Sequence, residues 1–319
     1  MKHPSAIFIL LVKVRGAGIW WHYKFDNGCN QLVRTGKMEL KSRFMEANDV
    51  YKIITSDLDE TLLRKDGSIS QQNIDAIAQA TARGVKFVPN TGRNFLTVQP
   101  LLEQLGLAQQ AGEYVISFNG GAVIENQGNR VVLSNEMPYA EAKRVFELFT
   151  EFDVDVHVYT LDHLYIYRPR EDDEAYLRTR GVAFTNFDGN FSQFKDNHVM
   201  KVIAMNPDMT VRRAANDRIQ AEFATINTAY SSGIYIEVNH GGVDKGNAIL
   251  ELGKQLGVSA DEIMAIGDND NDLPMLRKVG LPVSVQNGIP AVKEVAAYVT
   301  PHDYECGVAD AINKFVLNN

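Results

Sequence analysis

The sequence is poor in cysteine, and its amino-terminal region has no hydrophobic run long enough to span a membrane. Its 319 residues include two cysteines, Cys29 and Cys306, which are too few and too far apart for a disulfide framework or a zinc site. The apolar run at 6–12 has seven residues, whereas a transmembrane helix needs roughly 20. We therefore expect a protein of the reducing cytoplasm with no membrane partner.

The chain also lacks an excess of positive charge. It carries 32 Lys and Arg against 40 Asp and Glu, a net charge of -8. Proteins that bind the nucleic-acid backbone normally present a basic face, so we expect no nucleic-acid partner. With 45% hydrophobic and 23% charged residues, the composition is that of a globular protein, and the length predicts two domains.

Residues 1–50 differ from the rest of the chain. They hold eight Lys or Arg against four Asp or Glu, and both tryptophans. We predict a poorly structured extension, with the natural start at Met38 or Met45. Two alternatives stay open: a secretory signal, because the run at 6–12 reaches the lower limit of a signal-peptide core, and a docking or membrane-surface segment.

From residue 51 onward, β-prone runs alternate with helical segments, which is typical of an α/β protein. The predicted strands of this part cover residues 52–56, 85–88 and 114–118, and the predicted helices begin after Ser70 and near residue 95. Because crossovers between such strands are right-handed, we expect the strands to be parallel. The pattern returns after Gly241-Gly242, with a helix at 245–256 and strands at 263–266 and 281–285.

Between these two parts, residues 135–238 do not show the same regular alternation of strands and helices. A helix at 139–152 is followed by strand-like runs at 157–159, 164–167, 199–205 and 235–238, which indicates a separate α+β insert. The predicted fold class is thus α/β, with a Rossmann-like parallel-sheet core formed by residues 51–134 and 239–319 and an inserted α+β domain at 135–238.

Polar clusters follow the predicted core strands or open a core helix. They are Asp57-x-Asp59, Asn90-Thr91-Gly92-Arg93, Lys245-Gly246 and the run from Gly267 to Asp272. In open parallel sheets, ligands bind beyond the carboxyl ends of the strands. These clusters are therefore the candidate site.

Two carboxylates spaced as Asp57 and Asp59 can divide the work of phosphoryl transfer. Asp57 would attack phosphorus, and Asp59 would protonate the leaving group and then deprotonate water. The same spacing also fits an Asx turn or a helix cap, so taken alone it leaves both readings open.

The acids Asp268, Asp270 and Asp272 concentrate negative charge behind an apolar strand. Such an oxygen-rich cluster suits Mg²⁺. An EF-hand calcium loop begins in the same way, but here Leu273 replaces the glycine of its sixth position and Val279 the glutamate of its twelfth.

Lys245 and the pair Thr91-Gly92 fit a phosphate site. A lysine at a helix start adds its charge to the favourable field of the helix amino end, and a threonine hydroxyl with a glycine amide can bind a phosphate oxygen. Each of these short motifs also occurs on ordinary surfaces.

Taken in order, the motifs resemble those of the haloacid dehalogenase superfamily, most closely the Cof-type sugar phosphatases. The matching residues are Asp57-Leu58-Asp59-Glu60-Thr61-Leu62-Leu63, Thr91-Gly92-Arg93, Lys245-Gly246 and Gly267-Asp268-x-x-Asn271-Asp272. The resemblance covers about residues 51–319. It implies a haloacid-dehalogenase-like core whose insert is a cap that covers the site and selects the substrate.

The resemblance also implies residue roles. Asp57 is the expected nucleophile, and Asp59 is the expected acid and base, with a main-chain carbonyl that reaches Mg²⁺. The expected phosphate-binding residues are Thr91, Gly92, Arg93, Lys245 and Asn271. The expected metal-binding residues are Asp57, Asp59, Asp268 and Asp272. Glu60 departs from the family, where many relatives have glycine, and we expect this to leave the chemistry undisturbed.

These implications predict a Mg²⁺-dependent enzyme that hydrolyses small phosphomonoesters, such as sugar phosphates or phosphorylated cofactors, through an aspartyl-phosphate. A phosphosugar mutase or phosphotransferase and a catalytically silent binding protein remain as alternatives. The expected partner is a small phosphorylated metabolite, and the expected state is a monomer or small homo-oligomer. Polar insert residues that could line the substrate pocket are His157, Tyr159, His163, Tyr165, Tyr167, Arg168 and Lys201.

Overall fold

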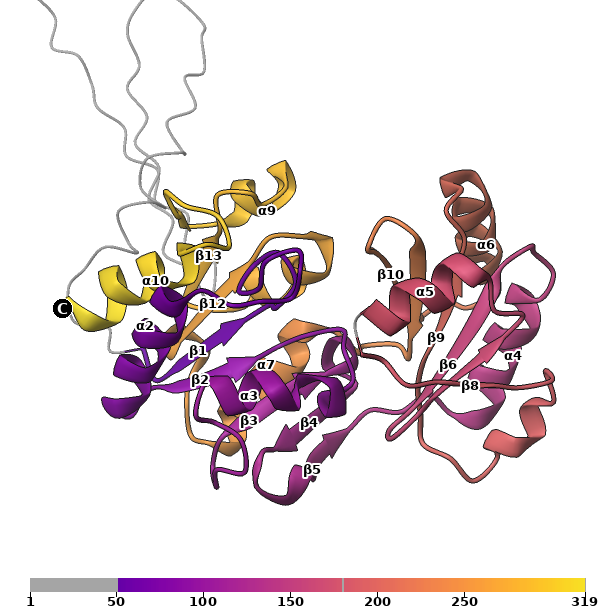
Figure 1. Cartoon of the computed structure of the whole chain (residues 1–319), viewed down its shortest axis with the longest axis horizontal. Coiled ribbons are helices and arrows are strands. Elements are labelled where there is room, and N and C mark those ends of the chain that lie inside the picture. The colour runs from indigo at the N-terminus through magenta and orange to yellow at the C-terminus, as the bar shows by residue number, and fades with distance from the viewer. Residues whose placement is uncertain (1–50, 180, 319) are drawn as a thin grey trace, which may run out of the picture. The chain divides into compact units, whose positions relative to one another are not determined.

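The computed structural model describes residues 51–179 and 181–318. Its central sheet has the strand order β14-β13-β12-β1-β2, and every neighbouring pair in it is parallel (Figure 1). The strands are β1 (Ile53–Ser56), β2 (Lys86–Pro89), β12 (Ile263–Gly267), β13 (Leu281–Ser284) and β14 (Tyr298–Val299). The expected α/β class with a parallel core sheet is confirmed.

Both faces of this sheet are buried. Ile54 and Met264 pack in one hydrophobic cluster, whereas their chain neighbours Ile53 and Ile263 pack in another. Side chains of a strand alternate between the two faces, so helices must cover both, as is usual for parallel sheets. The helical segments of the core are α2 (Gln71–Ala82), η2 (Phe95–Val98), α3 (Gln99–Gln104), α7 (Lys245–Gln255), η6 (Ala260–Glu262), η7 (Asp270–Asp272), α8 (Leu273–Leu276), α9 (Pro290–Val295), α10 (Gly307–Ile312) and η8 (Asn313–Leu317).

The strand predicted at 114–118 differs in part from expectation. β3 (Tyr114–Ser117) meets β2 through a single parallel bridge between Asn90 and Ile116. Its ladder, however, is antiparallel to β4 (Ala122–Glu125), which in turn pairs with β5 (Arg130–Ser134). Gly120 and Gly121, which follow Asn119, lie in the tight turn between β3 and β4.

The chain leaves the core after β5 and forms a mainly antiparallel sheet of strand order β10-β11-β9-β6-β7-β8, in which only β7 and β8 are parallel. Its strands are β6 (Asp155–Thr160), β7 (Leu164–Tyr167), β8 (Thr185–Asn186), β9 (Val199–Met205), β10 (Asn227–Ser231) and β11 (Tyr235–Asn239). The helices beside it are α4 (Tyr139–Phe149), α5 (Glu171–Thr179), η5 (Phe191–Phe194) and α6 (Met209–Glu222). The sequence did not reveal α5, α6, β8 or β10, because they are short or polar and carry little apolar periodicity.

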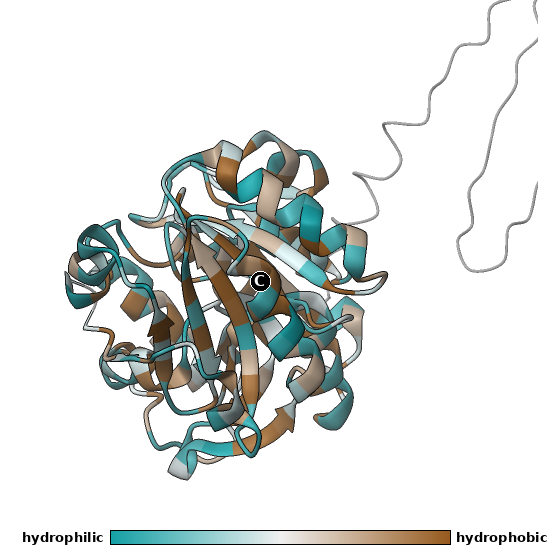
Figure 2. Cartoon of the chain, turned by 90° about the vertical axis from the view of Figure 1, so that its right-hand side faces the viewer, coloured by the Kyte–Doolittle hydropathy of each residue, from teal (hydrophilic) through white to brown (hydrophobic). Residues whose placement is uncertain are grey.

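The two faces of this second sheet have different roles. Val156, Val158 and Val202 pack against α4 and α6 in one hydrophobic cluster. On the other face of the same strands, Tyr159, Lys201 and Ile203 line a cavity. Figure 2 shows apolar residues concentrated on the central strands, with hydrophilic residues on the surrounding helices and loops. One face therefore builds the main core of the insert, and the part of the other face that α5 leaves uncovered is available for a site.

The predictions for residues 1–50 fall outside the described part of the chain. Among the described residues, no helix combines the length and apolar character that crossing a bilayer requires.

A close helix contact places the start of α7, and we expect it to be sensitive to one methyl group. A Cβ at Gly246 would lie 2.3 Å from the carbonyl oxygen of Pro274 in α8. Gly246→Ala should therefore lower the free energy of unfolding by about 2–3 kcal/mol through overpacking. The matched control is Gly84→Ala, where a Cβ meets open space but φ is +86°, with an expected cost of about 1 kcal/mol. Urea unfolding of both variants checks this, and an equal loss in the two would contradict the packing argument.

Candidate functional site

The polar clusters of the core converge at one edge of the parallel sheet. Asp57 follows β1, Thr91 lies just beyond β2, and Asp268 follows β12. These three strands are neighbours, so their carboxyl ends meet at the same edge. Most of the cluster residues line a cavity of about 620 Å³ whose other wall comes from residues 159–237.

Lys245 is the charge that links the clusters. Its side chain is fully buried, and its Nζ donates to Asp57 Oδ1 at 2.5 Å and to Asp272 Oδ1 at 2.7 Å. Burial alone would lower the pKa of Lys245, but Asp272 and Asp57 raise it above the ordinary lysine value. The ammonium therefore stays charged and fixes the ends of β1 and β12 to the start of α7.

Asp272 organises the loop after β12. Its Oδ2 accepts the backbone N–H groups of Asp268 at 2.9 Å and Asn269 at 3.0 Å, while Oδ1 accepts Lys245. A Cβ at Gly267 would lie 2.6 Å from this carboxylate, which explains the glycine at the end of the strand. Both oxygens of Asp272 thus have partners within the protein.

The acids Asp57, Asp268 and Asp272 together exceed the positive charge that Lys245 supplies. Burial raises the pKa of Asp57 well above its usual range; the Lys245 ammonium opposes this rise, and the neighbouring acids add to it. Burial and Asp272 raise the pKa of Asp268 to about 7, although Thr61 Oγ1 donates to its Oδ1 at 2.6 Å. One ammonium group thus faces three buried carboxyl groups. A divalent cation stabilises such an excess of carboxylates.

The geometry fits that cation. One carboxylate oxygen from each of Asp57, Asp268 and Asp272 lies within 4.8 Å of the others. An octahedral Mg²⁺ places neighbouring ligands about 3 Å apart and opposite ligands about 4 Å apart, because each bond is about 2.0–2.1 Å long. Small side-chain movements would suffice to close around the ion.

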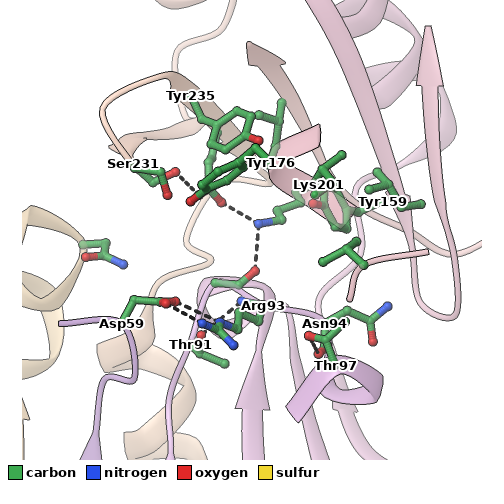
Figure 3. A pocket seen from close by; sticks show the side chains of 18 of the residues that line it. Asp59, Thr91, Arg93, Asn94, Thr97, Tyr159, Tyr176, Lys201, Ser231 and Tyr235 are labelled. Carbon is green, nitrogen blue, oxygen red and sulfur yellow. Dashed lines mark hydrogen bonds and ion pairs between the residues drawn. The ribbon is translucent and has the colours of Figure 1, made fainter. Parts of the chain in front are cut away.

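Asp59 lines the cavity, as Asp57 does, and pairs with Arg93 in a bidentate contact (Figure 3). Arg93 donates from Nε to Oδ2 at 2.9 Å and from Nη2 to Oδ1 at 2.5 Å. A guanidinium held in this way pairs with the carboxylate through two parallel hydrogen bonds and fixes its orientation. Arg93 thus holds Asp59 in place at the cavity.

The segment Thr91-Gly92-Arg93 forms a loop at the cavity. The Arg93 N–H donates to Thr91 Oγ1 at 3.1 Å. A Cβ at Gly92 would come within 3.0 Å of Asn119 Oδ1, so a larger residue would displace Asn119. The amide of Asn271 also approaches Asn119 Oδ1, at 3.4 Å.

The insert residues proposed from sequence divide into two groups. Tyr159, His163 and Lys201 line the cavity, as expected. His157 does not, because it is fully buried and bonded to Asp173 at 2.6 Å. Three further residues are also absent from the cavity wall: Tyr165 and Tyr167 pack in aromatic contacts and Arg168 stacks on Tyr167.

Sequence reasoning missed three residues that complete the site. Thr61 stands inside the first motif, but its hydroxyl was given no role. Asn119 is placed by a left-handed turn, with φ at 57°, and its amide donates to Glu237 Oε2 at 3.0 Å. Glu237 could have been suspected, because it is the one acid in the apolar strand at 235–238.

The backbone at position 60 adopts a conformation that favours glycine. Glu60 has φ of +59°, in the left-handed region that glycine occupies without strain. Its backbone N–H donates to the Leu63 carbonyl at 3.0 Å. The glutamate therefore adopts the backbone form of the turn at a steric cost of about 1–2 kcal/mol.

Comparison with known proteins places this site in a family. A family model described as haloacid dehalogenase-like hydrolase matches residues 54–312. A Streptococcus pyogenes protein provisionally named a phosphatase is 32% identical over 267 residues, covering 84% of this chain and 99% of that protein. A Bacillus subtilis protein named 5-amino-6-(5-phospho-D-ribitylamino)uracil phosphatase is 28% identical over 266 residues, covering 83% and 96%.

Solved structures agree on the fold. The crystal structure of a haloacid dehalogenase-like hydrolase from Bacteroides thetaiotaomicron has a TM-score of 0.74 at 24% identity, and the match covers 83% of this chain and 99% of that one. The matches extend over nearly the whole length of these proteins, insert included. The chain belongs to the haloacid dehalogenase-like hydrolase family.

Proposed function

We propose that this enzyme hydrolyses small phosphomonoesters with the help of Mg²⁺, through an aspartyl-phosphate on Asp57. The observation that carries the proposal is the buried Lys245, whose ammonium contacts Asp57 and Asp272 beside Asp268. Family membership makes the chain a hydrolase, and the names of its relatives support a phosphatase that acts on phosphorylated substrates.

The groups of the site suit the binding of a phosphate. Asp57, Asp268, Asp272 and the main-chain carbonyl of Asp59 would hold the metal ion, which when bound neutralises charge on the phosphoryl group. The hydroxyl of Thr91, the amide of Gly92 and the ammonium of Lys245 would bind phosphate oxygens, with Asn271 and Arg93 nearby. Phosphoryl transfer depends mostly on such positioning and neutralisation.

The first half-reaction makes one bond and breaks another. An Asp57 carboxylate oxygen attacks phosphorus, and the bond between phosphorus and the ester oxygen breaks. Protonated Asp59 gives its proton to the departing alcohol. Since Arg93 binds both carboxylate oxygens of Asp59, we propose that Arg93 leaves this carboxylate when the substrate enters and contacts the leaving group instead.

The second half-reaction regenerates the enzyme. Asp59, now ionised, takes a proton from water, whose oxygen attacks the phosphorus of the aspartyl-phosphate. The bond between Asp57 and phosphorus breaks, and inorganic phosphate leaves. Asp59 is thus acid in one step and base in the other, as the shared position of leaving group and water requires.

The volume of the cavity indicates the size of the substrate that the site can hold. Its volume of about 620 Å³ is in the range of small-molecule sites and leaves room for a leaving group larger than methanol or glycerol. Tyr159, Tyr176, Tyr230 and Tyr235 lie in its wall, and such rings combine apolar contact with a hydroxyl. We propose sugar phosphates and phosphorylated cofactors or their precursors as substrates, in a cytoplasmic enzyme.

The nucleophile is tested by Asp57→Asn. The amide cannot form the aspartyl-phosphate, so the rate of phosphate release should fall more than about 1,000-fold. The measurement is phosphate release from p-nitrophenyl phosphate, hexose and pentose phosphates, flavin mononucleotide, pyridoxal phosphate and 5-amino-6-(5-phospho-D-ribitylamino)uracil, with Mg²⁺ and with EDTA.

Asp270→Asn is the matched control, because Asp270 lies in the same acidic run but is exposed. It should retain most of the activity. Near-normal turnover by Asp57→Asn would refute the mechanism. Phosphate release that appears only when an acceptor sugar is added would favour a phosphotransferase, and ligand binding without turnover a silent binding protein.

Metal removal should lower thermal stability in a pH-dependent way. The raised pKa values of Asp57 and Asp268 mean that the metal-free folded state binds protons more tightly than the unfolded chain. Its stability therefore falls as pH rises from about 3.8, the ordinary Asp value, through about 7, the value for Asp268. Mg²⁺ displaces these protons, so the stabilisation by Mg²⁺ should be small at pH 5.5 and large at pH 8.

Thermal unfolding at both pH values, with Mg²⁺ and with EDTA, measures this difference. At 100 times the dissociation constant, binding should contribute about 2.7 kcal/mol at pH 8. Asp268→Asn should remove most of the shift, whereas Asp270→Asn should keep it. A shift of the same size at both pH values would contradict the assignment of the cation to these carboxylates.

A further inference from the structure

The insert presents a buried ion pair to the core. Lys201 in β9 and Glu237 in β11 are 3% and 6% exposed, and Lys201 Nζ lies 2.5 Å from Glu237 Oε2. Val202 pairs with Val238 across these adjacent strands, so Lys201 and Glu237 are diagonal neighbours on one face. A buried charge pair of this kind contributes little net stability unless further hydrogen bonds satisfy it.

Those further bonds reach the core. Lys201 Nζ donates to the Gly92 carbonyl at 2.8 Å, and Glu237 Oε2 accepts the Asn119 amide at 3.0 Å. Within the insert, Ser231 Oγ donates to Glu237 Oε1 at 2.5 Å, and Lys201 Nζ lies 4.7 Å from the ring centre of Tyr159. Figure 3 shows this chain of contacts crossing the cavity from Ser231 to the loop that bears Thr91 and Arg93.

The contact between Lys201 and the Gly92 carbonyl affects a hydrogen bond that Thr91 accepts. The Gly92 carbonyl and the Arg93 N–H belong to the same peptide group. An ammonium that binds the carbonyl polarises this group and strengthens its N–H as a donor. That N–H is the one that donates to Thr91 Oγ1, at 3.1 Å.

The hydroxyl of Thr91 is thereby oriented. Because Oγ1 accepts the Arg93 N–H, the hydroxyl proton must point elsewhere. Thr91 lines the cavity, and among the described residues no acceptor is assigned to its hydroxyl proton. The free proton can therefore be donated to a phosphate oxygen bound between Thr91 and Lys245.

We infer that Lys201, held by Glu237, is a positioning residue that acts through the Gly92 carbonyl to make Thr91 a phosphate donor. The inference rests on the proposed phosphatase function and adds a residue of the insert to it. Since Lys201 and Glu237 both belong to the insert while Gly92 and Asn119 belong to the core, the contact of Lys201 that supports the donor exists only while the insert covers the site. Phosphate binding and closure of the insert are thus coupled through one lysine.

A direct contact between Lys201 and the leaving group is the competing explanation, because Lys201 also lines the cavity. The two explanations differ in their dependence on substrate. An effect through Gly92 concerns the phosphoryl group, which all substrates share, and inorganic phosphate as well. An effect through the leaving group varies with its size and disappears for inorganic phosphate.

The test compares Lys201→Met with the double variant Lys201→Met/Glu237→Gln, which also removes the buried negative charge and so protects the fold. Both should lower kcat/KM by about 10- to 100-fold, the usual effect of losing a residue that orients a ligand-binding group. The loss should be the same factor for p-nitrophenyl phosphate and for the best substrate of the panel. Inhibition by inorganic phosphate should weaken in parallel.

Lys143→Met is the matched control, because Lys143 is an exposed lysine of the insert that pairs with Glu147 on its own helix, and it should behave as wild type. Circular dichroism and the Mg²⁺-induced shift in unfolding temperature should be unchanged in the double variant. Wild-type kinetics and phosphate inhibition in the folded double variant would overturn the inference, as would a loss confined to the larger substrate. A wild-type protein that releases no phosphate would instead overturn the proposed function itself.

Discussion

The shared ammonium of Lys245 is the interaction on which the rest of the site depends. It lies where β1, β12 and α7 meet, and it is the only cation in contact with Asp57 and Asp272 among the described residues. Without it, three buried acids would repel one another and the carboxyl ends of the strands would separate. The same charge brings the candidate nucleophile to the edge of the sheet where a phosphate would bind. The stability of this edge of the sheet and the proposed chemistry therefore both depend on Lys245.

The insert follows from a different constraint, the alternation of side chains along its strands. Apolar positions of β6, β9 and β11 pack against α4 and α6, and the intervening positions carry Tyr159, Lys201 and Glu237. Helix α5 covers part of the other face, where Leu177 packs on Leu164 and Ile166 and Tyr176 packs on Ile203, and the rest of that face is free for polar contacts. This free face supplies both the wall of the cavity and the ion pair that contacts the Gly92 loop.

Much of the core could be predicted from sequence because its signals are local. The apolar runs of β1, β2, β12 and β13 and the Ser70 cap of α2 each depend on a few adjacent residues. The hairpin of β3 and β4 was missed, because Asn119-Gly120-Gly121 can end a strand or turn it. In the insert, α6 was missed because its buried face consists of Arg212, Ala215 and Ile219, which gives a weak helical pattern.

The sequence by itself determined the strand-helix order, the acids Asp57, Asp59, Asp268 and Asp272, and the resemblance that joins them to Lys245. Local spacing suffices there, because each motif is a strand end or a helix start. Only the tertiary structure decided which insert residues reach the cavity, that His157 is buried against Asp173, and that Glu237 and Asn119 meet. These contacts join residues up to 118 positions apart. Strand register and packing of distant segments set such contacts, and no local pattern records them.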